Sequence, residues 1–269
     1  MPKIKVNDVN LYYEIHGQGQ PIVCISGFTG DHNGWGLVVE GLAKNHQVIT
    51  FDNRGIGLSD CPDYPYTMEM MAEDVMALMR ALHLQKAHLI GNSMGGNIAQ
   101  VIAYKHPEFV KSLVLGNSFM KAHGRGVLHV QTRLDLMKLG FPIPAEVVLH
   151  ELLLWMYSSN YLGQPGVVEM LTRAALANPI ATTIKGYESQ LNALLNFDSR
   201  TWIDKINVPC LVISSDDDLL ASPKEARQMT DKISGAEYFC FENIGHLPQL
   251  ECPEVFTRVV LEFIAKQDK

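Results

Sequence analysis

The segment Gly91-Asn92-Ser93-Met94-Gly95 sets a serine between small residues, at a point where the chain changes its pattern. The apolar run Ala87–Gly91 is typical of a buried strand, and a helix is expected from about Met94 to Lys105. A serine on such a sharp strand-to-helix turn needs small neighbours, because its backbone is strained and its hydroxyl must project. The amino terminus of the following helix favours developing negative charge. The spacing therefore predicts Ser93 as a nucleophile.

A serine at its ordinary pKa is a poor nucleophile, so a base must lie beside it. We expect His246 to be that base, because it follows the strand-like run Glu237–Phe241 and precedes the last helix. A loop in that position lies at the same edge of a parallel sheet as Ser93. For other histidines the expectation is a surface position, namely His16, His46, His83, His88, His106, His123, His129 and His150.

A histidine base needs a carboxylate that fixes its tautomer and stabilises the imidazolium. Three candidates, Asp216, Asp217 and Asp218, directly follow the strand-like run Cys210–Ser214. Three adjacent carboxylates cannot all face one histidine, and the order serine, aspartate, histidine along the chain is typical of one fold class. We choose Asp218, with Asp217 as the alternative.

The same chemistry needs hydrogen-bond donors for an oxyanion. One is expected to be the backbone N–H of Met94, the residue after the nucleophile. The second is expected in the loop Ser26–Gly30, where Phe28 can direct its N–H at the site and Gly27 permits a close approach.

These groups require a framework that brings loop ends together. In the first and last parts of the chain, strand patterns alternate with helix patterns, which indicates βαβ units and a mostly parallel sheet. Beside the runs already named, the expected strands are Lys3–Val9, Asn10–His16, Pro21–Ser26, Gln47–Asp52 and Ser112–Gly116, and the expected helices are Thr67–His83, Pro223–Ile233 and Pro253–Ala265.

Between Asn117 and about Asp198 the alternation stops and the pattern is helical, with helices expected at Ala145–Tyr157, Gly166–Ala177 and Ile180–Leu195. We expect an α/β core domain formed by residues 1–118 and 199–269, and a helical cap formed by residues 119–198. The cap should lie over Ser93 as a lid and filter substrates.

Substrate contacts are predicted at Asn92, which precedes the nucleophile, at Trp155 in the apolar run 152–157, and at Leu247 after the histidine. A substrate carboxylate would need a cation, and three cap arginines are candidates: Arg125, Arg133 and Arg173.

With these residues in place, the sequence resembles the α/β-hydrolase superfamily over nearly its whole length. The matching pieces are SGFTG (26–30), DNRGIGLSD (52–60), GNSMGG (91–96), SSDDD (214–218) and NIGHLPQLECPE (243–254). In the superfamily a small residue commonly stands three positions before the catalytic aspartate, a spacing that Ser215 and Asp218 fit. The oxyanion loop often begins His-Gly there, whereas this chain has Ser26-Gly27.

The resemblance implies an α/β-hydrolase fold with an inserted cap and a cofactor-free, metal-free serine hydrolase that cleaves an ester or lactone of a small acyl substrate. Residues 186–218 are similar to the 3-oxoadipate enol-lactonase and small-carboxylesterase group. The piece GNSMGG is similar to the meta-cleavage-product hydrolases, so hydrolysis of a C–C bond in a dienoate is the alternative. A non-catalytic ligand receptor on the same fold is a third possibility.

Composition agrees with such a protein. The 269 residues are 47% hydrophobic and 19% charged, with a formal net charge of −7. The acidic balance without a Lys/Arg cluster argues against nucleic-acid binding. No apolar run is long enough for a transmembrane helix, and the first residues lack a signal-peptide pattern. We therefore expect a cytoplasmic protein without membrane partners, whose five widely spaced cysteines form neither a disulfide framework nor a zinc site.

Overall fold

A computed structural model describes residues 2–178 and 182–268. In this part of the chain eight strands form one sheet in the order β1-β2-β4-β3-β5-β6-β7-β8. Their bounds are β1 (Lys3–Val6), β2 (Val9–His16), β3 (Gln20–Ile25), β4 (His46–Phe51), β5 (Ala87–Asn92), β6 (Val110–Gly116), β7 (Cys210–Ser215) and β8 (Glu237–Phe241).

The sheet is antiparallel at one end and parallel in the rest. The pairs β1–β2 and β2–β4 are antiparallel, and every pair from β4 to β8 is parallel. The central parallel strands β3, β5, β6 and β7 are buried and apolar over most of their length, because helices cover both faces of the sheet there. Their carboxyl ends therefore meet at one edge of the sheet, where the loops that carry the predicted site residues begin.

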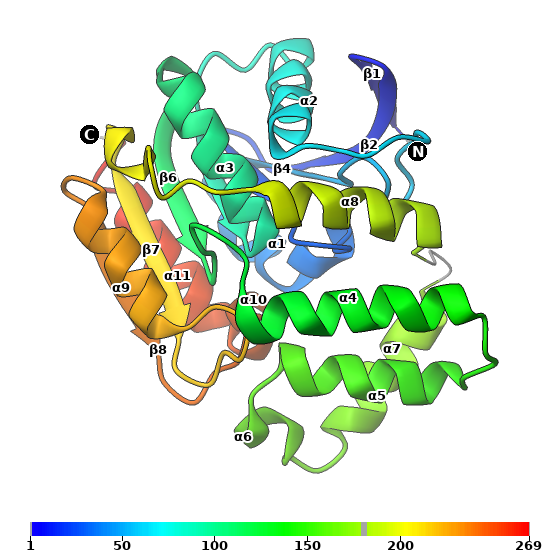
Figure 1. Cartoon of the computed structure of the whole chain (residues 1–269). Coiled ribbons are helices and arrows are strands. Elements are labelled where there is room, and N and C mark those ends of the chain that lie inside the picture. Colours follow the sequence, from blue (N-terminus) through cyan, green and yellow to red (C-terminus); the bar gives the residue numbers. More distant parts are fainter. Residues whose placement is uncertain (1, 179–181, 269) are drawn as a thin grey trace.

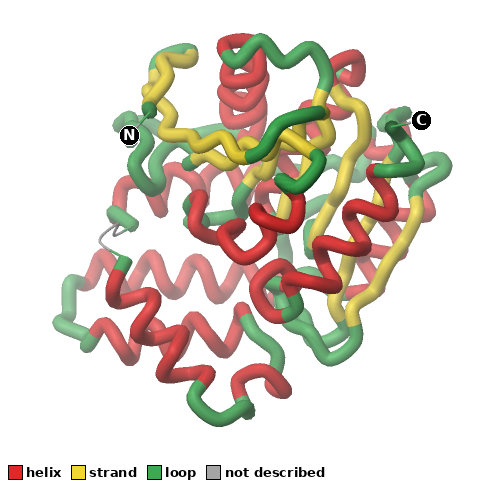
Figure 2. Tube along the Cα trace, turned by 180° about the vertical axis from the view of Figure 1, so that it is seen from behind, coloured by secondary structure: helices red, strands yellow, loops and turns green. Residues whose placement is uncertain are grey.

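Two groups of helices enclose the sheet, as Figures 1 and 2 show from opposite sides. On one face, α2 (Met68–Ala81), α3 (Met94–Lys105) and α9 (Pro223–Lys232) bury their apolar sides in the larger core cluster. On the other face, α1 (Gly36–Leu42) and α11 (Pro253–Ile264) form the second cluster. The predicted α/β-hydrolase architecture is confirmed.

A further group of helices follows β6 and lies together beside the carboxyl edge of the sheet in Figure 1. These helices are α4 (Gly124–Leu139), α5 (Ala145–Met156), α6 (Ser159–Leu162), α7 (Val167–Ala177) and α8 (Ile184–Asn196). The last of them packs into the larger core cluster through Tyr187, Leu191 and Leu194. The expected helix start at Ile180 lies outside the described residues.

The longest helix of this group, α4, is absent from the prediction. Three of its sixteen residues are buried, His129, Val130 and Leu134, and Leu128, Leu136 and Leu139 are exposed. An apolar pattern spread around the helix gives no clear face, which is the signal that sequence reasoning depends on.

The remaining elements of the described residues are short: three 3-10 helices at His32–Trp35, Pro107–Phe109 and Ile203–Lys205, and the one-turn helix α10 at Pro248–Glu251. Within the described residues, no helix is long and apolar enough to cross a membrane. The five cysteines are free thiols, and Cys24 and Cys210 are buried in strands.

Candidate active site

Ser93 occupies the turn between β5 and α3 with φ at 53° and ψ at −124°. Positive φ is costly for a residue with a side chain, so the surrounding chain must hold this conformation. The Ser93 N–H donates to Gly116 O at 2.8 Å, and Ser93 O accepts from Gly96 N at 2.9 Å. Ser93 is partly exposed, although Asn92 and Met94 on either side are buried. The turn therefore pushes the serine out of the core, as predicted.

The need for a small residue after the serine has a direct cause. A Cβ on Gly95 would collide with the carbonyl group of Ile25 at the end of β3. The first turn of α3 consequently packs directly against the β3 backbone, and this contact fixes the height of Ser93 above the sheet.

His246 and Asp218 form a buried pair beyond the carboxyl ends of β7 and β8. Asp218 Oδ2 lies 2.7 Å from His246 Nδ1, and the two side chains are 0% and 3% exposed. Asp218 Oδ1 accepts the backbone N–H groups of Leu220 at 2.7 Å and Ala221 at 3.0 Å. A carboxylate bound in this way has a fixed direction, and it in turn orients the imidazole.

Asn117, which the sequence reasoning missed, completes this arrangement. It follows β6 with a φ of 45° and donates from Nδ2 to Asp218 Oδ2 at 2.8 Å. Its N–H also donates to Ile213 O at 2.9 Å. The available signal was its place directly after a strand, at the same edge as Ser93.

The three consecutive aspartates have different partners. Asp216 Oδ1 accepts the N–H of Asn243 at 2.6 Å. Asp217 Oδ2 accepts the N–H of Ser159 at 2.8 Å. Only Asp218 of the three contacts His246, and the alternative Asp217 binds the first residue of α6.

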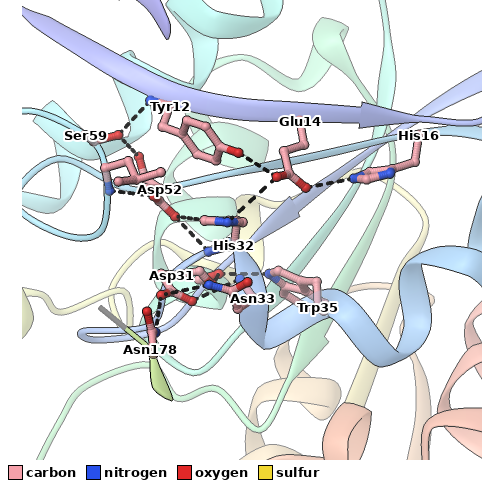
Figure 3. Close-up of polar contacts among 12 residues, drawn as sticks. Tyr12, Glu14, His16, Asp31, His32, Asn33, Trp35, Asp52, Ser59 and Asn178 are labelled. Carbon is pink, nitrogen blue, oxygen red and sulfur yellow. Dashed lines mark hydrogen bonds and ion pairs between the residues drawn. The ribbon is translucent and has the colours of Figure 1, made fainter. Parts of the chain in front are cut away.

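The loop between β3 and α1, which contains Phe28, is anchored by polar contacts that Figure 3 shows in part. Trp35 Nε1 donates to Ser26 Oγ at 2.9 Å, and Ser26 Oγ donates to Asp31 O at 3.0 Å. Asn178, just after α7, donates to Asp31 Oδ2 at 3.1 Å. The loop is therefore bound to the sheet domain on one side and to the helical group on the other.

Behind this loop, His32 lies between two carboxylates (Figure 3). Its N–H and its Nδ1 each lie 2.7 Å from Oδ1 of the buried Asp52, and its Nε2 is 3.8 Å from Glu14 Oε1. Tyr12 donates its hydroxyl to Glu14 at 2.6 Å. This hydrogen bond raises the pKa of Tyr12 to about 12 and lowers the pKa of Glu14. Nothing in the local sequence singles out His32 for this position.

Gln190 on α8 is a second residue that the sequence did not reveal. It is fully buried. Its Oε1 accepts the N–H of Thr29 at 3.0 Å, and its Nε2 donates to Arg54 O at 3.0 Å. Thr29 has a φ of 58°, so this hydrogen bond supports a strained residue next to Phe28.

A cavity of about 680 Å³ lies between this edge of the sheet and the helical group. Ser93, His246, Phe28, Asn92 and Leu247 all line it. The structure thus brings the predicted nucleophile, base, loop residue and two of the three substrate contacts to one space. Much of its wall is apolar and comes from α4, α5 and α7, with Val130, Met137, Leu149, Leu152 and Leu171.

Trp155 does not lie where the sequence placed it. It is outside the described lining of the cavity, because its ring stacks on His129 at a centroid distance of 4.5 Å and its Nε1 donates to Glu151. Arg133 does line the cavity, but its guanidinium donates to Glu151 Oε2 at 3.0 Å. Arg125 and Arg173 are exposed side chains that are not among the described lining residues.

Three histidines expected at the surface are buried instead: His46, His88 and His129. His88 donates or accepts at both ring nitrogens, toward Ser112 and Asp268. Burial lowers the pKa of His88 to about 4 and also lowers the pKa of His129. His46 is paired through Nε2 with Asp268, while its buried Nδ1 has no hydrogen-bond partner among the described residues. Residue type alone does not reveal that these three side chains are buried. Within the described residues, no group of three or more His, Cys, Asp or Glu side chains is arranged to hold a metal.

The fold and the position of Ser93 define a class of protein that comparison with known proteins identifies directly. The family model described as alpha/beta hydrolase fold matches residues 20–253, and the chain belongs to this family. Over 275 residues it is 30% identical to a protein named "Putative carbamate hydrolase RutD" from Azorhizobium caulinodans, with 100% of both chains covered.

Solved structures agree with the family. The enol-lactonase from Burkholderia xenovorans LB400 superposes with a TM-score of 0.87 and 27% identity, covering 98% of this chain and 100% of that one. A thermophilic esterase from Thermogutta terrifontis superposes with a TM-score of 0.87 and 25% identity, covering 100% of both. The prediction of an enzyme of the α/β-hydrolase class is confirmed at this level.

Proposed function

We propose that this protein is a serine hydrolase that cleaves a carboxylic ester or lactone of a small acyl substrate. One observation carries the proposal: the strained Ser93 lines the same cavity as His246, whose Nδ1 is bound by the buried Asp218. The enol-lactonase and the esterase with which the chain superposes bear names of the same chemical class.

In the proposed reaction, Ser93 Oγ attacks the substrate carbonyl carbon while His246 Nε2 accepts the hydroxyl proton. His246 then returns this proton to the leaving alcohol as the C–O bond breaks, which leaves an acyl group on Ser93. A water molecule, deprotonated by His246, attacks the acyl carbon and releases the acid. Asp218 holds Nδ1–H throughout and stabilises the imidazolium.

The oxyanion that forms at each step needs donors. We assign this role to the backbone N–H groups of Phe28 and Met94. Met94 opens α3, so its N–H has no acceptor within the helix. Gly27 lies beside the serine, since a Cβ on it would be 3.0 Å from Ser93 Cβ. The loop backbone is therefore close enough for the neighbouring N–H to take part.

We further propose that residues 119–198 act as the cap, with residues 1–118 and 199–269 as the core domain. The cap side of the cavity is largely apolar, which suits an acyl or alcohol group without charge. Arg133 is paired with Glu151, so an additional substrate carboxylate would have to displace an existing partner. This arrangement favours neutral esters and lactones over acidic substrates.

Replacing Ser93 with alanine tests the proposal. In the Ser93→Ala variant, kcat on p-nitrophenyl butyrate should fall by at least about 10³-fold, because the proposed acyl-enzyme cannot form without the Ser93 hydroxyl. A fluorophosphonate probe should label the wild-type protein at Ser93 and leave the variant unlabelled. The exposed Ser234 provides the matched control, since Ser234→Ala should change neither result. Undiminished turnover in Ser93→Ala would refute the assignment.

Assays on the same wild-type protein distinguish the two alternative functions, C–C bond hydrolysis and ligand binding without catalysis. A meta-cleavage-type dienoate assayed beside short esters should be the poorer substrate, and a clear preference for the dienoate would point to C–C bond hydrolysis. A folded wild-type protein that neither turns over esters nor reacts with the probe would favour a ligand receptor.

A further inference from the structure

The chain that joins α5 to α6, residues Met156–Ser159, lies directly against the loops that carry the proposed acid and base. The backbone N–H of His246 donates to Met156 O at 2.9 Å. The backbone N–H of Ser159 donates to Asp217 Oδ2 at 2.8 Å. We call Met156–Ser159 the cap strap, because it connects the helical group to the His246 loop.

Glu251 binds both sides of this contact. Its Oε1 accepts the N–H of Gly245 at 2.8 Å and the N–H of Ser158 at 3.0 Å. Its Oε2 accepts the hydroxyl of Ser158 at 2.6 Å. One carboxylate thus satisfies the residue before His246 and two donors of the cap strap. Burial raises the pKa of Glu251, and the hydrogen bonds from Ser158 and Gly245 oppose this rise.

The contact is also tightly packed. A Cβ on Gly245 would lie 2.6 Å from Ser158 N, 2.6 Å from Tyr157 C and 2.7 Å from Glu251 Oε1. No side chain fits between the His246 loop and the cap strap. A displacement of either one therefore reaches the other through the backbone.

We propose that Glu251 is a positioning residue that holds Gly245 and His246 against the cap strap, so that the imidazole stays aligned between Asp218 and the cavity. The proposal rests on the proposed role of His246 as the base. Glu251 itself is outside the described lining of the cavity. It acts on the reaction only through the backbone of the histidine loop. Because it binds this loop to the cap strap, the position of the His246 imidazole depends on the position of the cap.

Kinetics of Glu251 variants test the proposal. Glu251→Ala removes all three acceptor contacts and should lower kcat by about tenfold or more, because a small misplacement of a reacting group is costly. Glu251→Gln keeps the Oε1 acceptor for Gly245 and Ser158, and its amide can donate to the Ser158 hydroxyl. It should keep kcat within about threefold of wild type. KM on p-nitrophenyl butyrate should change little in either variant.

Glu251→Asp separates geometry from charge and serves if the alanine variant does not fold. It keeps the carboxylate but is one methylene too short to reach both N–H groups, so it should be less active than Glu251→Gln. The exposed Glu254 supplies the control, since Glu254→Ala should leave kcat unchanged. Folding is checked by far-ultraviolet circular dichroism and urea unfolding.

Two results would overturn the proposal: a folded Glu251→Ala protein with wild-type kcat, or an aspartate variant as active as the glutamine variant. Loss of activity in Ser93→Ala together with wild-type kcat in Glu251→Ala would refute the positioning role alone. Persistent activity in Ser93→Ala would instead refute the hydrolase mechanism on which it rests.

Discussion

At the scale of single residues, the acidic run after β7 shows how neighbours of one type acquire different tasks. Asp216 accepts the Asn243 N–H and Asp217 accepts the Ser159 N–H. Both therefore accept hydrogen bonds from backbone N–H groups of neighbouring segments. Asp218 alone binds an imidazole. The three carboxylates differ in the groups that lie next to them in the fold, and residue type alone does not separate them.

Replacing these aspartates one at a time should separate the tasks. Asp218→Asn keeps the shape but removes the charge that stabilises the imidazolium, so kcat on p-nitrophenyl butyrate should fall by about 10³-fold or more. Asp217→Asn and Asp216→Asn, the controls, should each cost less than about tenfold. If Asp217→Asn were the more damaging change, the assignment of Asp218 would be wrong.

The sequence points to the residues of the proposed reaction more readily than to the residues that support them. Ser93, His246 and Asp218 lie in local patterns whose strand and helix context is visible in the sequence. Asn117, Gln190 and Glu251 act through contacts between segments far apart in the chain, which no local pattern records. Trp155 was misplaced for a related reason: an aromatic side chain in an apolar helix can face the cavity or a neighbouring ring, and here it stacks on His129.

At the scale of elements, the strands and core helices were predicted to within a few residues, because buried parallel strands are short continuous apolar runs. The predicted Glu237–Phe241 and Met94–Lys105 agree with β8 and α3 at both ends. The helix α4 was missed because its apolar residues are partly exposed and follow no single face. A helix that lines a cavity need not pack on the core, so the periodic spacing of apolar residues that identifies core helices is weak in it.

Helix α8 supports the loop of Phe28 through Gln190, and a substitution of Gln190 removes these hydrogen bonds. Gln190→Leu keeps the volume but leaves the N–H of Thr29 and the carbonyl of Arg54 without their partners. We expect kcat to fall by about tenfold, because the proposed oxyanion donor next to Thr29 loses its support. Asn192 on the same helix donates to Tyr66 O and gives the control. Asn192→Leu should reduce stability to urea but not kcat, and equal kcat losses in both would contradict the role of Gln190.

The helix α5 supplies part of the cavity wall, and its size should set the accepted chain length. Leu149 lines the cavity, so Leu149→Trp should narrow it and lower kcat/KM for p-nitrophenyl octanoate relative to the acetate by about tenfold. Leu154 on the same helix is 63% exposed and outside the described lining. Leu154→Trp is the control and should leave the ratio unchanged. An unchanged ratio in both variants would place the acyl chain elsewhere.

At the scale of the whole molecule, the two edges of the sheet carry different kinds of histidine. His246 lies at the carboxyl edge and lines the cavity, and its Nδ1 is bound by Asp218. His88 lies near the start of β5, is 0% exposed, and has both ring nitrogens engaged, with Ser112 Oγ at 2.7 Å and Asp268 Oδ1 at 3.1 Å. Asp268 also binds Lys111, so the end of the chain is held to this edge. The same residue type is thus proposed to act in the reaction at one edge and is buried in the packing at the other.

The buried His88 should make stability depend on pH. Burial lowers its pKa in the folded protein to about 4 from the ordinary value of 6.5. Between pH 4 and pH 6.5 the His88 imidazole is therefore protonated in the unfolded chain but neutral in the folded protein. The contribution of the neutral His88 to the free energy of unfolding is complete above pH 6.5 and is lost as the pH falls toward 4. When the pH is lowered from 7 to 4.5, the free energy of unfolding measured in urea should fall by about 2 kcal/mol more in wild type than in His88→Gln. The exposed His150 provides the control, since His150→Gln should follow the wild-type curve. Parallel curves for wild type and His88→Gln would mean that His88 does not carry the pH dependence.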